Sequence, residues 1–88
     1  MTTLYLDLET FSPVPITHGT HAYAEKSEVL MVAYAFDDEA VQVMDLTAGG
    51  SLDNVQMLID SADTVVIHNS AFDRTVLRHH NVYIPVDK

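Results

Sequence analysis

The sequence predicts a single small α/β domain built around one mixed sheet. Three observations predict it: segments that alternate between apolar and polar residues, one short segment that is apolar throughout, and two segments with apolar residues at helical spacing. Their order is strand, strand, strand, helix, strand, helix, which is typical of helices packed on a sheet. A chain of 88 residues forms one domain at most, so we treat residues 1–88 as one unit.

The first three strands are expected in the first half of the chain. Residues 4–8 place Leu4, Leu6 and Leu8 on one face, with polar residues between them. Residues 29–36 are continuously apolar and too short for a typical helix, which predicts a central strand covered on both faces. Residues 41–45 alternate again after a polar turn at 37–39, and this predicts an antiparallel hairpin.

The other segments predict a loop, two helices and a fourth strand. Residues 12–26 contain Pro13, Pro15 and Gly19, which predicts a long surface loop. Residues 52–59 have helical spacing after a capping Ser51, and this helix should cross from the third strand to the fourth. Residues 64–68 predict that strand, and a second helix should run from residue 70 and stop at Asn81.

Composition and charge exclude several classes of protein. A hydrophobic fraction of 48% with 19% charged residues is globular, and the absence of cysteine excludes disulfides and thiolate metal sites. A net charge of −9 repels phosphate, so any nucleic acid must be reached through metal ions or another polypeptide. The chain has no long apolar run and no signal-peptide pattern, so we expect a soluble cytoplasmic protein with no membrane partner.

Two acidic pairs at i,i+2 spacing occur, and their settings differ. Asp37 and Glu39 lie in the predicted turn, where charge is simply solvated, whereas Asp7 and Glu9 extend from the end of an apolar strand on one face. Like charges held together there favour a counter-charge, and Mg²⁺ or Mn²⁺ prefers such oxygen ligands. The alternative is that both carboxylates only border the strand end.

A second polar cluster lies where the fourth strand turns into the last helix. If residues 64–68 run parallel to residues 4–8, Asp73 meets Asp7 and Glu9 at the carboxyl edge of the sheet, where sites form in open α/β folds. Taken alone, Asn69 or Ser70 is an ordinary helix cap and Asp73 an acid favoured by the helix dipole.

Together, residues 6–10 (LDLET) and 67–73 (IHNSAFD) resemble the first two motifs of the DEDD (DnaQ-like) 3′→5′ exonucleases, which have the ribonuclease H-like fold. Residues 23–25 (YAE) and 31–38 (MVAYAFDD) further look like the exonuclease domain of bacteriophage family A DNA polymerases. The resemblance implies the N-terminal portion of a ribonuclease H-like mixed sheet. It also implies a bacterial host cell as the location.

The resemblance implies a proofreading function and a set of site residues. Asp7, Glu9 and Asp73 would be three of four carboxylates that hold two divalent ions, Mg²⁺ or Mn²⁺, and hydrolyse the terminal phosphodiester of a DNA strand. Thr10 and Phe11 would contact the nucleotide at the 3′ end of single-stranded DNA, and Asn69 would support the second motif or the strand.

The family's fourth Asp and its Tyr or His companion lie on a later helix, and nothing after Asp73 matches them. We therefore expect this chain alone to be inactive, with the remainder of a polymerase chain or a partner subunit completing the site. We also expect self-association through an open sheet edge. The alternatives are a non-catalytic remnant that serves as an interaction or structural module, and a nuclease that borrows its missing carboxylate from another chain.

The histidines permit a rival interpretation as a zinc site. His18 and His21 are at i,i+3 spacing, and His79 and His80 are adjacent. The first two fall in the predicted loop, and consecutive side chains on a helix diverge by about 100°, so solvated or half-buried histidines are the better expectation.

Overall fold

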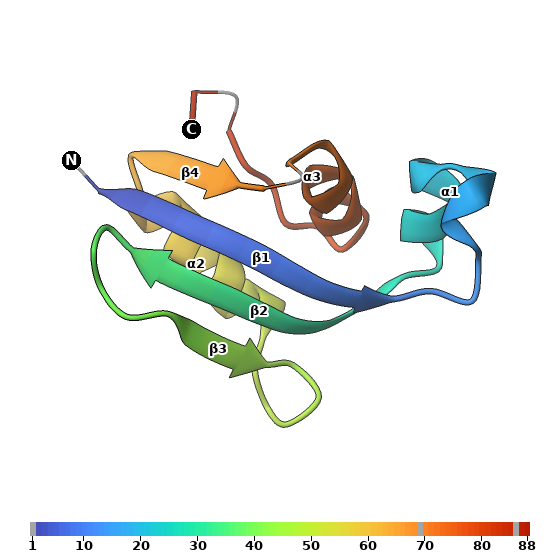
Figure 1. Cartoon of the computed structure of the whole chain (residues 1–88), viewed down its shortest axis with the longest axis horizontal. Coiled ribbons are helices and arrows are strands. Elements are labelled where there is room, and N and C mark those ends of the chain that lie inside the picture. Colours follow the sequence, from blue (N-terminus) through green and yellow to red (C-terminus); the bar gives the residue numbers. More distant parts are fainter. Residues whose placement is uncertain (1, 69, 86) are drawn as a thin grey trace.

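The computed structural model describes residues 2–68, 70–85 and 87–88, without the side chain of Ser70. Four strands form one mixed sheet in the order β3-β2-β1-β4 (Figure 1). They are β1 (Thr3–Phe11), β2 (Glu28–Phe36), β3 (Gln42–Asp45) and β4 (Thr64–Ile67). The helices are α1 (Thr20–Glu25), α2 (Leu52–Ser61) and α3 (Ser70–His79), with a short 3₁₀ helix, η1 (Ile16–His18), before α1. This mixed α/β architecture is compatible with the ribonuclease H-like fold that the sequence predicts.

The strand directions agree with the prediction. β1 pairs antiparallel with β2, and β2 pairs antiparallel with β3, which completes the expected hairpin. β4 runs parallel to β1, from Thr64 opposite Thr3 to Ile67 opposite Leu6. Since β1 continues to Phe11, its second half extends past the end of β4.

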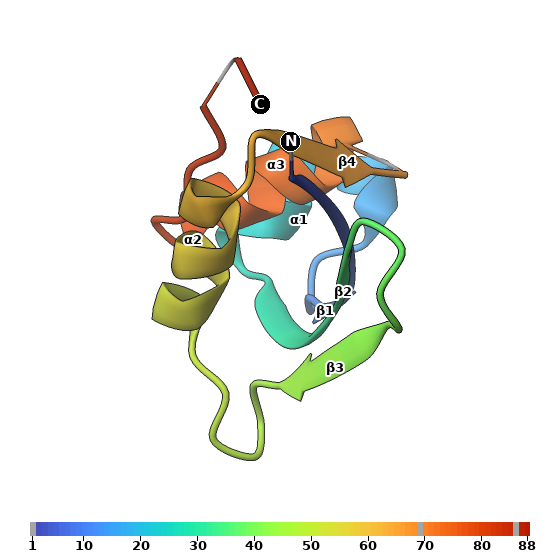
Figure 2. The ribbon, with the colours of Figure 1, turned by 90° about the vertical axis from the view of Figure 1, so that its left-hand side faces the viewer.

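One face of the sheet is covered and the other is open. Figure 2 shows the helices gathered on one side of the strands. The core between them consists of apolar side chains of the sheet and of α2 and α3, among them Leu4, Val32, Val55, Ile59 and Leu77, which are fully buried. The prediction that residues 29–36 are covered on both faces is wrong for the described chain, because Met31 on the opposite face of β2 is exposed.

Both long helices begin or end where the sequence predicts. Ser51 Oγ accepts a hydrogen bond from the Asp53 amide at 3.1 Å, so it is the N-cap of α2. Asn81 has a φ of 64°, the left-handed conformation that ends many helices, and it follows α3 closely.

The prediction of one long loop over residues 12–26 is wrong in its second half. Pro13 and Pro15 lie in the irregular stretch at the start of this segment, before η1. Gly19 separates η1 from α1 and adopts a φ of 100°. From Thr20 the chain has no further breaker, and Ala24 is buried in the core. Packing therefore stabilises a helix of six residues that would not be stable alone.

Candidate functional site

The ends of β1 and β4 place two acidic side chains at the same edge of the sheet, within electrostatic range of each other. β4 stops opposite Leu6, so Asp7 is the first β1 residue beyond the parallel pairing. The chain then enters α3, which carries Asp73 in its first turn. The charge of Asp7 acts on the Asp73 carboxyl, so the parallel strands bring together two of the three predicted carboxylates.

Asp73 is the buried member of the pair. Only 5% of its surface is exposed, whereas Asp7 is exposed to solvent. The pKa of Asp73 is raised to about 6, mainly by burial and also by the negative charge of Asp7, while the Leu8 backbone amide acts in the opposite direction and lowers it. That amide is free to reach Asp73 because β4 ends two residues earlier along the pairing.

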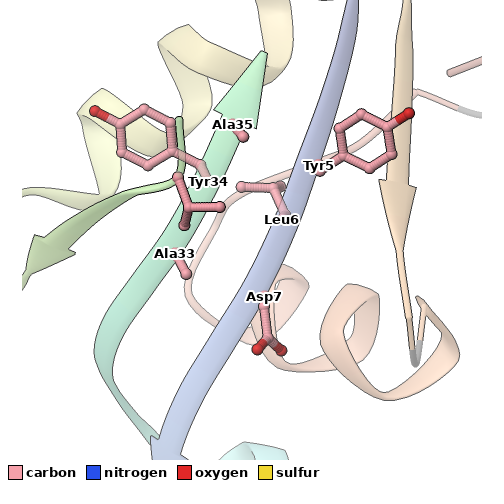
Figure 3. Close-up of a pocket in the computed structure, with 7 residues that line it drawn as sticks. Tyr5, Leu6, Asp7, Ala33, Tyr34 and Ala35 are labelled. Atoms are coloured by element: carbon pink, nitrogen blue, oxygen red, sulfur yellow. The ribbon is translucent and has the colours of Figure 1, made fainter. Parts of the chain in front are cut away.

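Glu9 shares the open face of β1 with Asp7 but does not complete a cluster. Both side chains are exposed, and both line a hollow of about 380 Å³ on this face with Met31, Ala33 and Val43. A neighbouring hollow of about 250 Å³ is bounded by Asp7 and by Tyr5, Ala33 and Ala35 (Figure 3). Within residues 2–68, 70–85 and 87–88, no three His, Asp or Glu side chains form a group that could hold a metal ion.

The donor set fits part of a divalent cation site. Two carboxylates, one of them desolvated and repelled by the other, are oxygen ligands of the kind that Mg²⁺ and Mn²⁺ prefer. A cation between them would favour the ionised form of Asp73 that burial now disfavours. The remaining ligands would have to come from a movement of Glu9, from water or from another segment of polypeptide.

The three predicted substrate contacts have different outcomes. Phe11 is 57% exposed at the end of β1, so its ring is accessible. The Thr10 hydroxyl instead hydrogen-bonds to the Tyr23 hydroxyl at 3.0 Å, on the side of the sheet where α1 lies. Asn69 lies outside the described residues.

The histidines do not form the rival zinc site in the described chain. The rings of His21 and His79 approach edge to face with centroids 6.0 Å apart, and His80 Nε2 lies 3.4 Å from Ser27 Oγ. These pairs link α1 and the segment after it to the end of α3. Asp37, from the other acidic pair, has a structural contact, because its carboxylate accepts a hydrogen bond from the Thr3 amide at 2.9 Å.

Two elements of the site were not foreseen from the sequence. The Leu8 amide gives no sequence signal, since any residue there supplies the same group. Tyr23 falls within the predicted loop of residues 12–26, whereas in the structure its ring centroid lies 5.4 Å from that of Phe72, the neighbour of Asp73.

No family model matches the chain, and no solved structure matches it. It is 38% identical over 85 residues to the DNA polymerase of Bacillus phage SP02, and the match covers 91% of this chain but 13% of the polymerase. None of the helices in the described residues is long and apolar enough to cross a membrane. Along most of its length, therefore, the chain is similar to a short part of a phage DNA polymerase.

Proposed function

We propose that this chain is part of a metal-dependent 3′→5′ exonuclease domain that proofreads for a DNA polymerase. The observation that carries the proposal is the pair formed by exposed Asp7 and buried Asp73 at the carboxyl end of two parallel strands. The similarity to a phage DNA polymerase supports a polymerase-associated role. The remainder of such a polymerase and the 3′ end of a DNA strand are the proposed partners.

Asp7 and Asp73 would hold Mg²⁺ or Mn²⁺, with Glu9 as a third ligand from the same strand. When bound, two such ions activate water and stabilise the leaving 3′ oxygen of a phosphodiester. Asp7 shares a strand face with Glu9 and its charge acts on Asp73, so it is the residue that would link the three carboxylates into one set of ligands. Phe11, at the end of the same strand, would stack against the terminal base.

Thermal melts with and without Mn²⁺ test the metal site through Asp7→Asn. In chelator this variant should melt at or above wild type, because the repulsion between Asp7 and Asp73 is gone. It should gain less from Mn²⁺ than wild type, for which a hundredfold excess over the dissociation constant stabilises by about 2.7 kcal/mol.

Asp38→Asn is the matched control, since it removes the same charge from an exposed turn. It should respond to Mn²⁺ as wild type does. If Asp7→Asn is clearly destabilised in chelator, or responds to Mn²⁺ like the control, Asp7 is a structural residue and the metal site is refuted.

Nuclease activity of the 88-residue chain alone should be negligible. The described residues hold no complete ligand group, and a net charge of −9 gives little attraction for a DNA strand. Incubation with a 3′-labelled single strand and Mn²⁺ checks this. Degradation that Asp7→Ala abolishes would show that the chain is complete as a catalyst.

The second candidate function is a non-catalytic interaction module. The incomplete ligand group favours it, because a remnant has no need of a third carboxylate near Asp7. Thermal melts of wild type distinguish the two candidates. Mn²⁺ should raise the melting temperature of an exonuclease domain and should not change that of a non-catalytic module.

A further inference from the structure

Tyr23 connects the two elements that carry the acidic pair. Its hydroxyl hydrogen-bonds to Thr10 Oγ1 on β1 at 3.0 Å, and its ring packs on Phe72 in the first turn of α3 with centroids 5.4 Å apart. The contacts come from opposite ends of one side chain. A single residue of α1 therefore bridges β1 and α3.

This bridge lies close to a second link between the two elements. The backbone amide of Leu8 on β1 acts on the Asp73 carboxyl of α3 and lowers its pKa. Thr10 lies two residues after Leu8, and Phe72 immediately precedes Asp73. The bridge through Tyr23 thus ends within two residues of both Leu8 and Asp73.

Other residues of α1 and of the segment after it also contact the core and α3, so α1 and α3 are held in a fixed relative position. Ala24 is buried in the core, and Ser27 Oγ donates to the Ala24 carbonyl at 2.8 Å while lying 3.4 Å from His80 Nε2. His21 meets His79 at the far end of α3. Contacts at both ends of α3 therefore fix its position relative to α1.

We propose that Tyr23 is a positioning residue that sets the separation between Asp7 and Asp73 by holding the first turn of α3 against the end of β1. The proposal rests on the proposed function for its chemical meaning, since the separation matters only if both carboxylates serve one site. The Tyr23 hydroxyl is already bonded to Thr10 and part-buried, so it acts through its neighbours.

Two substitutions break the bridge with little change in shape. Tyr23→Phe removes the hydroxyl and keeps the ring on Phe72, and Thr10→Val removes the partner hydroxyl at similar volume. Tyr34→Phe is the matched control, because it removes a tyrosine hydrogen bond, to Gln42 Oε1 at 3.3 Å, that joins β2 to the edge strand β3 and involves neither β1 nor α3.

Amide hydrogen exchange measured by NMR without metal reports the position of α3. Tyr23→Phe and Thr10→Val should each accelerate exchange of the Leu8 amide roughly threefold to tenfold more than that of Leu4 or Val32, as expected for loss of one hydrogen bond. Tyr34→Phe should leave the ratio unchanged. Uniform acceleration of all three amides would mean that Tyr23 only stabilises the fold, and the proposal would be overturned.

Mn²⁺ affinity measured by EPR adds the second readout. Both bridge variants should raise the dissociation constant roughly threefold to tenfold, and Tyr34→Phe should not. If wild type binds Mn²⁺ and the bridge variants bind it equally well, the positioning role fails while the metal site survives. If wild type binds no Mn²⁺, the proposed function fails, and Leu8 exchange still decides whether Tyr23 positions α3.

Discussion

At the scale of single residues, Asp73 is the group whose environment differs most from that of the free amino acid. Its pKa in the folded chain is about 6 against an ordinary 3.8, from burial first and from Asp7 second. A carboxyl group so placed is neutral in mild acid and charged at neutral pH. Its protonation is therefore coupled both to folding and to any cation that binds beside it.

The first prediction concerns the pH dependence of stability. Because the folded-state pKa of Asp73 is raised, its contribution to stability is fully present below pH 3.8 and is lost as pH rises through about 6. Relative to Asp73→Asn, whose amide does not ionise, wild type without metal should lose roughly 2 kcal/mol between pH 4 and 7.

Urea unfolding of wild type and Asp73→Asn across this range, in chelator, measures the difference. Comparison of the two proteins cancels the contribution of the other acidic residues. A constant difference in the free energy of unfolding from pH 4 to 7 would contradict the raised pKa. Added Mn²⁺ should reduce the loss at pH 7 in wild type only.

At the scale of elements, the sequence predicted the strands and the two long helices, and missed α1. Alternation located β1 and β3, and the capping serine located the start of α2, because these signals are local. α1 has no such signal: its N-cap position is Gly19, and no side chain caps it. It is stabilised by contacts with α3, which lies about fifty residues later in the chain.

The same reasoning explains what was predictable in the site. Alternation placed Asp7 and Glu9 on one face, and the parallel course of β4 brought Asp73 to Asp7. The burial of Asp73 and the direction of the Thr10 hydroxyl depend on how α3 and α1 pack. Such packing depends on elements that are distant in the chain, so it produces no periodic pattern of residues from which it could be predicted.

The second prediction tests the cap of α2. Ser51→Ala removes the side-chain acceptor for the Asp53 amide and should lower the free energy of unfolding by about 1 kcal/mol. This corresponds to a fall in melting temperature of about 4–8 °C for a domain of this size. Ser51→Asn keeps an acceptor and should melt close to wild type; equal losses in both variants would show that the cap contributes nothing.

At the scale of the whole molecule, the open face of the sheet is apolar although the chain carries a large negative charge. Tyr5, Met31, Val43 and Val66 are large apolar side chains exposed on this face, beside the edge strand β3. Exposed apolar faces and unpaired edges favour association, whereas a net charge of −9 opposes it. Salt screens the charge and leaves the apolar attraction.

The third prediction follows from that balance. The chain should self-associate at high concentration, and more so at 0.5 M than at 0.05 M NaCl, as measured by light scattering. Val43→Lys on the open face should reduce the association. Met57→Lys makes the same charge change at an exposed apolar residue of α2 and should not. A monomer under all these conditions would contradict the prediction.

The β-bulge between β1 and β2 affects the curvature of the strands without affecting the alternation of buried and exposed side chains. Glu9 is opposite Met31 and Thr10 is opposite Val29, so Leu30 is an extra residue on β2. Removing Leu30 would make these consecutive pairs, and the neighbouring side chains would keep the faces they now occupy. The β1–β2 pair would lose part of its curvature, because a bulge bends the strand and increases the local twist. Without the bend, Thr10 would lie farther from Tyr23 and their hydrogen bond would be lost. A deletion that leaves the hydrophobic pattern almost unchanged would therefore alter the position of Asp73 relative to Asp7 through the change in strand shape alone.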